Sequence, residues 1–87
     1  MKRTHNEPSG AFHEVNWASQ LLRDRGHAID RPEIWSDGSM RRFVNGVAMT
    51  NPEVINMART YPEWRDTERR FLKYLNRHQA SMAVNAR

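Results

Sequence analysis

Residues 33–50 read EIWSDGSMRRFVNGVAMT and contain two glycine turns, which decide the expected fold. Asp37-Gly38 and Asn45-Gly46 both accept the positive φ angles of a tight β-hairpin turn. They separate three short runs with apolar or aromatic residues, at positions 33–35, 40–44 and 47–50. This pattern predicts a three-stranded antiparallel meander.

Pairing across these turns assigns the side chains of the meander to two faces. One face carries Trp35, Met40, Val44, Val47 and Met49, and we expect it to meet the helices. The other face carries Ile34, Arg41, Phe43 and Ala48.

A helix through the same region is the alternative, and it would give a small all-α bundle. The apolar residues with the i, i+3, i+4, i+7 spacing of a helix are Met40, Phe43, Val44 and Val47, and Ser39 can cap the start. However, Asn45-Gly46 in the middle would cost such a helix about 1 kcal/mol or more. The meander is therefore favoured.

Two further helices are expected on either side of the meander. Residues 11–25 have apolar side chains at three- and four-residue intervals, with Ser9 as a cap and Gly26 as a C-terminal glycine. After the meander, Asn51 as cap and Pro52 in the first helical position open a short helix of at most two turns. That helix must end before Pro62, since a residue that precedes proline disfavours the helical conformation.

A long helix is predicted from about Pro62 to Gln79 or beyond, with Thr60 and Glu63 at capping-box spacing. The predicted class is therefore α+β: an N-terminal helix, a three-stranded antiparallel meander, a short helix and a long C-terminal basic amphipathic helix. We expect a disordered tail over residues 1–10, a single small globular domain over residues 11–80 and a frayed tail over residues 81–87.

Basic side chains dominate one side of the long helix. At about 100° per residue, an apolar stripe is formed by Trp64, Phe71, Leu75 and Met82, with Leu72 on its flank. The opposite side carries Arg65, Arg69, Lys73 and Arg77 at i, i+4 spacing, joined by Arg70. The exposed side of this helix is therefore expected to be strongly cationic.

The composition suits an anionic partner. The chain has 87 residues, with 14 Lys or Arg, 10 Asp or Glu and a net charge of +4. Only Lys2 and Lys73 are lysine, so twelve of the 14 cations are arginine. A guanidinium forms planar bidentate pairs with phosphates and carboxylates. The partner is therefore expected to be nucleic acid, DNA or RNA, or an acidic protein surface.

The candidate binding residues are Arg65, Arg69, Arg70, Lys73 and Arg77 on the long helix, with Arg41 and Arg42 of the meander as a second group. Three aromatic residues, Trp17, Tyr61 and Tyr74, are candidate contacts, because an exposed ring can stack on an unpaired base.

Catalytic and metal-binding patterns are missing from the sequence. The four histidines, at positions 5, 13, 27 and 78, lack the i, i+3 or i, i+4 spacing that places two on one helix face, and there is no cysteine. The glycines are isolated and form no phosphate loop or nucleophile elbow. We therefore expect a protein that is not an enzyme, with no metal, no cofactor and no small-molecule substrate.

A membrane role is not expected either. No apolar run approaches the roughly 20 residues that a bilayer requires. The N-terminal residues also lack the hydrophobic stretch of a signal peptide. Cytoplasmic localisation is the prediction.

Residues 17–46 combine Trp17, Ala18, Leu21, Leu22 and Gly26 with the run Asp37-Gly38-Ser39-Met40-Arg41-Arg42-Phe43. This order of a helix, a glycine and an Asp-Gly turn leading into an Arg-Phe strand resembles the opening of phage- and plasmid-type primase-helicase proteins. The glycine- and tryptophan-rich continuation of that family is absent, as are its zinc ligands and polymerase carboxylates. The resemblance implies a hairpin at Asp37-Gly38 and a replication protein of a mobile element, and it does not carry over primase activity.

The resulting hypothesis is a non-enzymatic binding module of a phage or mobile element that contacts nucleic-acid phosphates through its arginine-rich helix face. The alternative is a small inhibitor or accessory protein that docks this face on an acidic surface of a host enzyme. Nothing in the sequence identifies a helix end that enters a DNA groove, so sequence specificity is not predicted.

Overall fold

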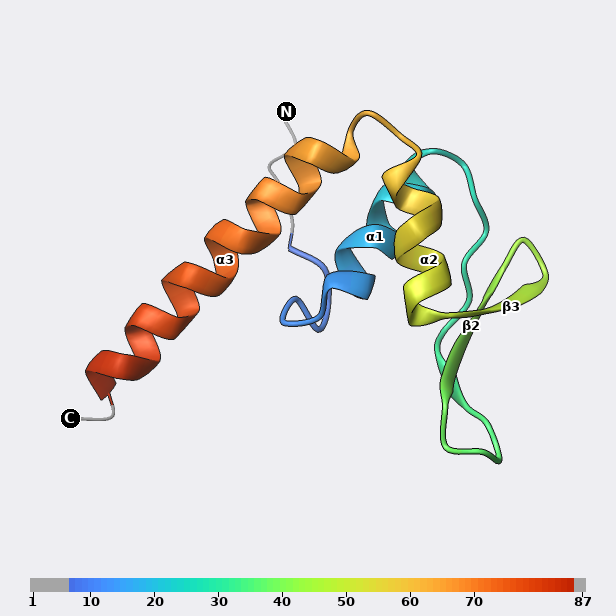
Figure 1. Cartoon of the computed structure of the whole chain (residues 1–87), viewed down its shortest axis with the longest axis horizontal. Coiled ribbons are helices and arrows are strands. Elements are labelled where there is room, and N and C mark those ends of the chain that lie inside the picture. The colour runs from blue at the N-terminus through green and yellow to red at the C-terminus, as the bar shows by residue number, and fades with distance from the viewer. Residues whose placement is uncertain (1–6, 86–87) are drawn as a thin grey trace.

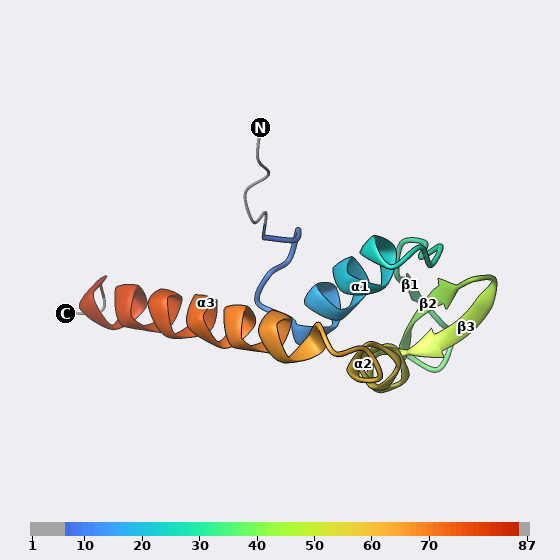
Figure 2. The same ribbon diagram turned by 90° about the horizontal axis from the view of Figure 1, so that it is seen from above.

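The computed structural model describes residues 7–85, which form three helices and a three-stranded antiparallel sheet (Figure 1). The elements in chain order are α1 (Glu14–Asp24), β1 (Glu33–Ile34), β2 (Met40–Val44), β3 (Val47–Thr50), α2 (Asn51–Arg59) and α3 (Trp64–Asn85). The predicted α+β class is confirmed, because residues 40–44 and 47–50 are paired strands and not part of a helix. In both views α3 passes α1 and extends beyond it, while the sheet lies at the other end of the molecule (Figures 1 and 2).

The meander follows the two turn signatures. β2 pairs with both neighbours, so the strand order is β1-β2-β3. At the second turn Asn45 and Gly46 have φ angles of 53° and 85°, and at the first turn Gly38 has a φ of 86°. Positive φ at both central residues gives a two-residue loop the twist that antiparallel strands require.

Trp35 lies on the opposite face of the sheet from the one predicted. The Trp35 N–H donates to the Ser39 carbonyl over 2.8 Å, so the first loop spans three residues, 36–38, and Met40 pairs with Ile34. A two-residue Asp-Gly loop would have paired Trp35 with Met40. This difference of one residue moves each β1 side chain to the other face. Trp35 therefore shares its face with Arg41, and Ile34 takes the predicted place of Trp35.

α1 ends within one residue of its predicted end, but it begins at Glu14 and not at residue 11. The N–H of Gly26, whose φ is +98°, donates to the Arg23 carbonyl over 3.0 Å, and the His27 N–H donates to the Leu22 carbonyl over 2.9 Å. These two bonds form a Schellman motif, which glycine favours because it has no Cβ. At the other end, the cap residue is His13 without a side-chain hydrogen bond, so Ser9 is not the cap.

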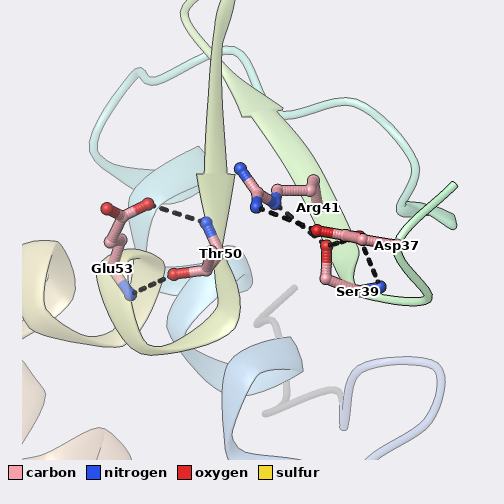
Figure 3. A network of polar contacts seen from close by, with 5 residues as sticks. All are labelled: Asp37, Ser39, Arg41, Thr50 and Glu53. Carbon is pink, nitrogen blue, oxygen red and sulfur yellow. Dashed lines mark hydrogen bonds and ion pairs between the residues drawn. The ribbon is translucent and has the colours of Figure 1, made fainter. Parts of the chain in front are cut away.

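α2 is capped by Thr50 and not by Asn51 (Figure 3). Thr50 Oγ1 accepts from the Glu53 N–H over 3.4 Å, and Glu53 Oε1 accepts from the Thr50 N–H over 2.8 Å. This is a complete capping box, and Pro52 in the first turn needs no donor of its own. The nine-residue helix is slightly longer than the two turns predicted and ends before Pro62.

α3 begins at Trp64 without the predicted capping box. Thr60 Oγ1 donates back to the Met57 carbonyl over 2.7 Å, and Glu63 instead pairs with Arg25 over 2.9 Å. α3 therefore begins after a short turn, residues 60–63, which is hydrogen-bonded to the end of α2.

The two predicted tails fall partly outside the described residues, which exclude 1–6 and 86–87. Within the first tail, residues 7–10 are tied to the domain. Asn16 Nδ2 donates to the Gly10 carbonyl over 2.6 Å, and Glu7 pairs with Arg77 over 3.0 Å. At the other end, α3 continues to Asn85, beyond the predicted domain limit at residue 80.

The core forms where α1 packs on both α2 and α3, and where α2 covers the sheet. The main cluster of buried side chains comprises Val15, Ala18, Leu21, Leu22, Val44, Val54, Ala58 and Trp64. A second cluster joins Trp17 and Ala11 to Phe71 of α3. α1 is therefore the element that holds the other two helices together.

Leu22→Ala is expected to lower the free energy of unfolding by about 2–5 kcal/mol, because Leu22 is 0% exposed and its loss leaves a cavity in the main core. The matched control is Leu72→Ala, since Leu72 is 52% exposed and its truncation should change stability by no more than about 0.5 kcal/mol. Urea denaturation followed by circular dichroism measures both. Equal costs for the two variants would contradict this core.

Candidate functional site

The rotation of α3 about its axis is set by its contacts with α1. The buried side of α3 carries Trp64, Thr67 and Phe71. The Phe71 ring lies 6.1 Å, centroid to centroid, from Trp17 of α1, and Trp17 Nε1 donates to the Ala11 carbonyl over 2.8 Å. Because helical periodicity places the other residues relative to this side, Arg65, Arg69 and Lys73 face away from α1.

Three cations form an exposed line on that outer side, Arg65, Arg69 and Lys73, and we call them the cationic row. Arg69 pairs with Asp66 of the same helix over 3.2 Å. Within residues 7–85, no ion pair involves Arg65 or Lys73. In the part of the chain that the structure describes, no carboxylate from another element therefore pairs with the row.

Arg70 and Arg77 lie beside the row and are held by other groups. The Arg70 guanidinium carbon lies 5.6 Å from the centroid of the Trp17 ring, and its Nη1 lies 3.8 Å from Asp66. Arg77 pairs with Glu7 over 3.0 Å. These groups border a hollow of about 450 Å³ along α3. Both arginines extend the cationic surface, but each already has a partner within the protein.

The three candidate aromatic residues have different environments. Trp17 is only 3% exposed and belongs to the core, so its ring does not reach a partner. Tyr61 is partly buried, and its hydroxyl forms a 2.7 Å hydrogen bond with His27 Nε2. Tyr74 is also partly buried, with its ring centroid 5.6 Å from that of Phe12, and it lines the hollow beside Arg70 and Arg77. Tyr74 is the aromatic residue that the structure brings to the α3 surface.

Arg41 and Arg42 do not belong to that surface, since the sheet lies away from α3 in both views (Figures 1 and 2). Arg41 is held within its own hairpin (Figure 3). Its guanidinium carbon lies 4.7 Å from the Trp35 ring, and Nε donates to Ser39 Oγ over 3.2 Å. Arg42 points the other way, toward α1, and is buried.

Arg59 is a further cation that helical periodicity did not reveal. With Arg65 it borders a hollow of about 800 Å³ at the corner between α2 and α3, where Glu68 supplies an opposite charge. Arg59 is the last residue of α2, and the turn at 60–63 separates it from α3. Only the geometry of that turn shows that the cationic surface continues around the corner.

No metal-binding group of three or more His, Cys, Asp or Glu occurs within the described part of the chain. No helix among residues 7–85 is both long enough and apolar enough to cross a membrane. Comparisons with models of protein families, with curated proteins and with solved structures found no match to this chain.

The Asp37 carboxylate is expected to titrate below its ordinary value of 3.8 in the folded protein. The Ser39 hydroxyl and the Ser39 N–H both donate to it, over 2.6 and 2.9 Å, and Arg41 lies nearby, so the pKa of Asp37 is lowered. A lowered pKa means that the turn is stabilised above pH 3.8 and loses this contribution as the pH falls through the folded-state pKa. Carboxyl ¹³C NMR measures the titration.

Ser39→Ala is the matched variant for this titration, because it removes the hydroxyl and leaves the backbone donor. The pKa of Asp37 should move back toward 3.8 in that variant. An Asp37 pKa at or above 3.8 in the unsubstituted protein would contradict the described turn.

Proposed function

We propose that this protein is a non-enzymatic module that binds nucleic acid by contacting phosphates with the cationic row. The observation that carries the proposal is the exposure of Arg65, Arg69 and Lys73 on the side of α3 away from α1, with no carboxylate of another described element pairing with them. The resemblance over residues 17–46 supports an origin in a phage or another mobile element.

The energetics of the row favour a polyanionic ligand. Like charges at i, i+4 destabilise an isolated helix by roughly 0.2–0.5 kcal/mol per pair, and the row contains two such pairs. A phosphate backbone removes this repulsion and releases its own condensed counterions on binding. Successive members of the row are about 6 Å apart along the helix axis, so all three can contact one strand of a nucleic acid.

The expected mode of binding is independent of base sequence. Phosphate contacts position a protein on a duplex but carry no sequence information. Tyr74 beside Arg77 adds a partly exposed ring that can stack on an unpaired base. Single strands are therefore bound at least as readily as duplexes.

The dependence of affinity on salt tests the proposal. Three phosphate contacts at about −0.9 each give an expected log–log slope near −2.7 for duplex DNA. Arg69→Gln should reduce the slope to about −1.8, and the triple variant R65Q/R69Q/K73Q should remove most of the binding. Fluorescence anisotropy with labelled duplex and single strands, over a series of NaCl concentrations, measures these slopes.

Arg41→Gln is the matched control, because it removes the same charge from β2, which lies away from α3 (Figure 1). It should leave the slope unchanged. A salt-independent affinity, or an equal loss in Arg41→Gln and Arg69→Gln, would contradict binding through the row.

One feature favours the second candidate, a protein that docks on an acidic surface of an enzyme. Leu72 is 52% exposed and lies next to Lys73, so it offers an apolar contact that phosphates do not use. Under this alternative Leu72→Ala weakens association and nucleic acids do not bind. A stoichiometric partner retained from nuclease-treated lysate, together with no binding of DNA or RNA, would favour it over our proposal.

A further inference from the structure

Arg42 is a buried cation without a counter-ion. Arg42 is only 5% exposed. Its Nη2 donates to Asn16 Oδ1 over 2.7 Å, and its Nη1 donates to Ser19 Oγ over 3.3 Å. Both partners are neutral. Within residues 7–85, no carboxylate pairs with Arg42 and no acceptor takes its Nε–H.

A buried guanidinium without a counter-ion lowers the stability of a folded protein. Buried charges in proteins are normally paired, since the desolvation penalty amounts to several kcal/mol per ion. Burial lowers the pKa of Arg42, and the positive charge of Arg23 lowers it further. Arg23 and Arg42 therefore lie close enough for their charges to repel, and within residues 7–85 neither forms an ion pair with a carboxylate.

A pocket of about 720 Å³ opens beside Arg42, between α1 and the sheet, and we call it the α1–β2 pocket. Its titratable lining residues are Arg23, Arg31, Arg42 and His13, and no Asp or Glu lines it. Residues 1–6, which precede the pocket in the chain, also contain no acidic side chain. Among the described residues no carboxylate therefore lines this pocket, whereas Asp30 and Glu33 line a neighbouring hollow with Arg23 and Arg31.

A second buried atom without a partner lies in the wall of the pocket. Asn51 Oδ1 is buried and has no hydrogen-bond partner among the described residues, and Asn51 lines the pocket together with Arg42. Both unpaired atoms are shielded from solvent, so they lie in the wall behind the pocket and do not themselves contact a ligand in it.

We propose that the α1–β2 pocket binds a phosphate group, either free or as a monoester. The buried charge of Arg42 attracts the phosphate from the inner wall, and the exposed Arg23 and Arg31 donate to its oxygens from the mouth. A phosphate fits three cations better than a carboxylate does, because it carries up to two negative charges and more acceptor oxygens.

The volume admits more than inorganic phosphate. Pockets that bind small molecules span about 300–1,000 Å³, so a nucleotide or the phosphorylated end of a strand fits in size. This site does not depend on the proposed function of α3, since none of its lining residues lies on α3.

The test compares thermal unfolding and calorimetric titration in sodium phosphate with those in sodium chloride of equal ionic strength. Phosphate is expected to bind saturably and to raise the unfolding temperature. The double variant R23Q/R31Q, which changes two exposed residues, should weaken phosphate at least about tenfold, as expected for the loss of charge-assisted hydrogen bonds. The charge-matched control R25Q/R41Q, outside the pocket, should bind phosphate as the unsubstituted protein does.

Arg42→Met adds a second readout, because it replaces the buried charge with an apolar chain of similar length. This variant is expected to remain folded, with unchanged or higher stability in chloride, and to lose the response to phosphate. If it does not fold, R23Q/R31Q still decides the question.

Two oligonucleotides that differ only in a 5′-phosphate or a 5′-hydroxyl distinguish the source of the ligand. Tighter binding of the 5′-phosphorylated strand, abolished by R23Q/R31Q, assigns the pocket to a strand end, whereas binding of inorganic phosphate alone assigns it to a free ion.

Equal effects of phosphate and chloride, with no preference for the 5′-phosphate, would overturn the proposal. So would equal phosphate binding by R23Q/R31Q and R25Q/R41Q. If the α3 variants lose duplex binding but still bind phosphate, the α3 surface and the α1–β2 pocket act independently, and each proposal is judged on its own result.

Discussion

The contact between Trp17 of α1 and Phe71 of α3 determines what the surface of this protein presents. The indole is almost fully buried and is oriented by its hydrogen bond to the Ala11 carbonyl, so Phe71 meets a ring with a fixed position. Once that side of α3 is held, helical geometry turns Arg65, Arg69 and Lys73 outward. The same contact places the Arg70 guanidinium over the outer face of the indole. A charged surface of this kind depends on a small apolar contact that excludes water beneath it.

The elements of the fold could be predicted because the local signals were strong. Asn45-Gly46, Gly38 and Gly26 occupy positions with positive φ, which few other residues adopt. The errors arose where two local solutions have similar energies. A three-residue loop replaced the two-residue one before β2, and Thr50 instead of its neighbour became the cap of α2. Such choices depend on the sheet and the helices packing together, which a short stretch of sequence does not specify.

The candidate site was predicted in part. Periodicity identified the outward side of α3, including the cationic row, because an amphipathic helix encodes its own orientation. It did not show that Arg77 meets Glu7, which lies 70 residues away in the sequence, or that Arg59 continues the surface around the corner. Arg42 was predicted as a binding residue because it lies in the meander between the two turns, where a hairpin could present it to a phosphate backbone. The structure buries it, since its place in β2 turns it toward Asn16 and Ser19 of α1.

Two cationic regions thus differ in character. The row on α3 is open and repeats along a helix, which suits an extended polyanion. The α1–β2 pocket is a hollow with the buried Arg42 in its wall and no carboxylate among its lining residues, which suits a single anionic group. The most direct test of the α3 surface is an NMR titration that follows the arginine Nε–H signals as a short DNA duplex is added. The account predicts that the Arg65 and Arg69 signals shift first and furthest, while those of Arg25 and Arg41 stay in place. Shifts centred on the sheet arginines, or none on α3 at low salt, would contradict it.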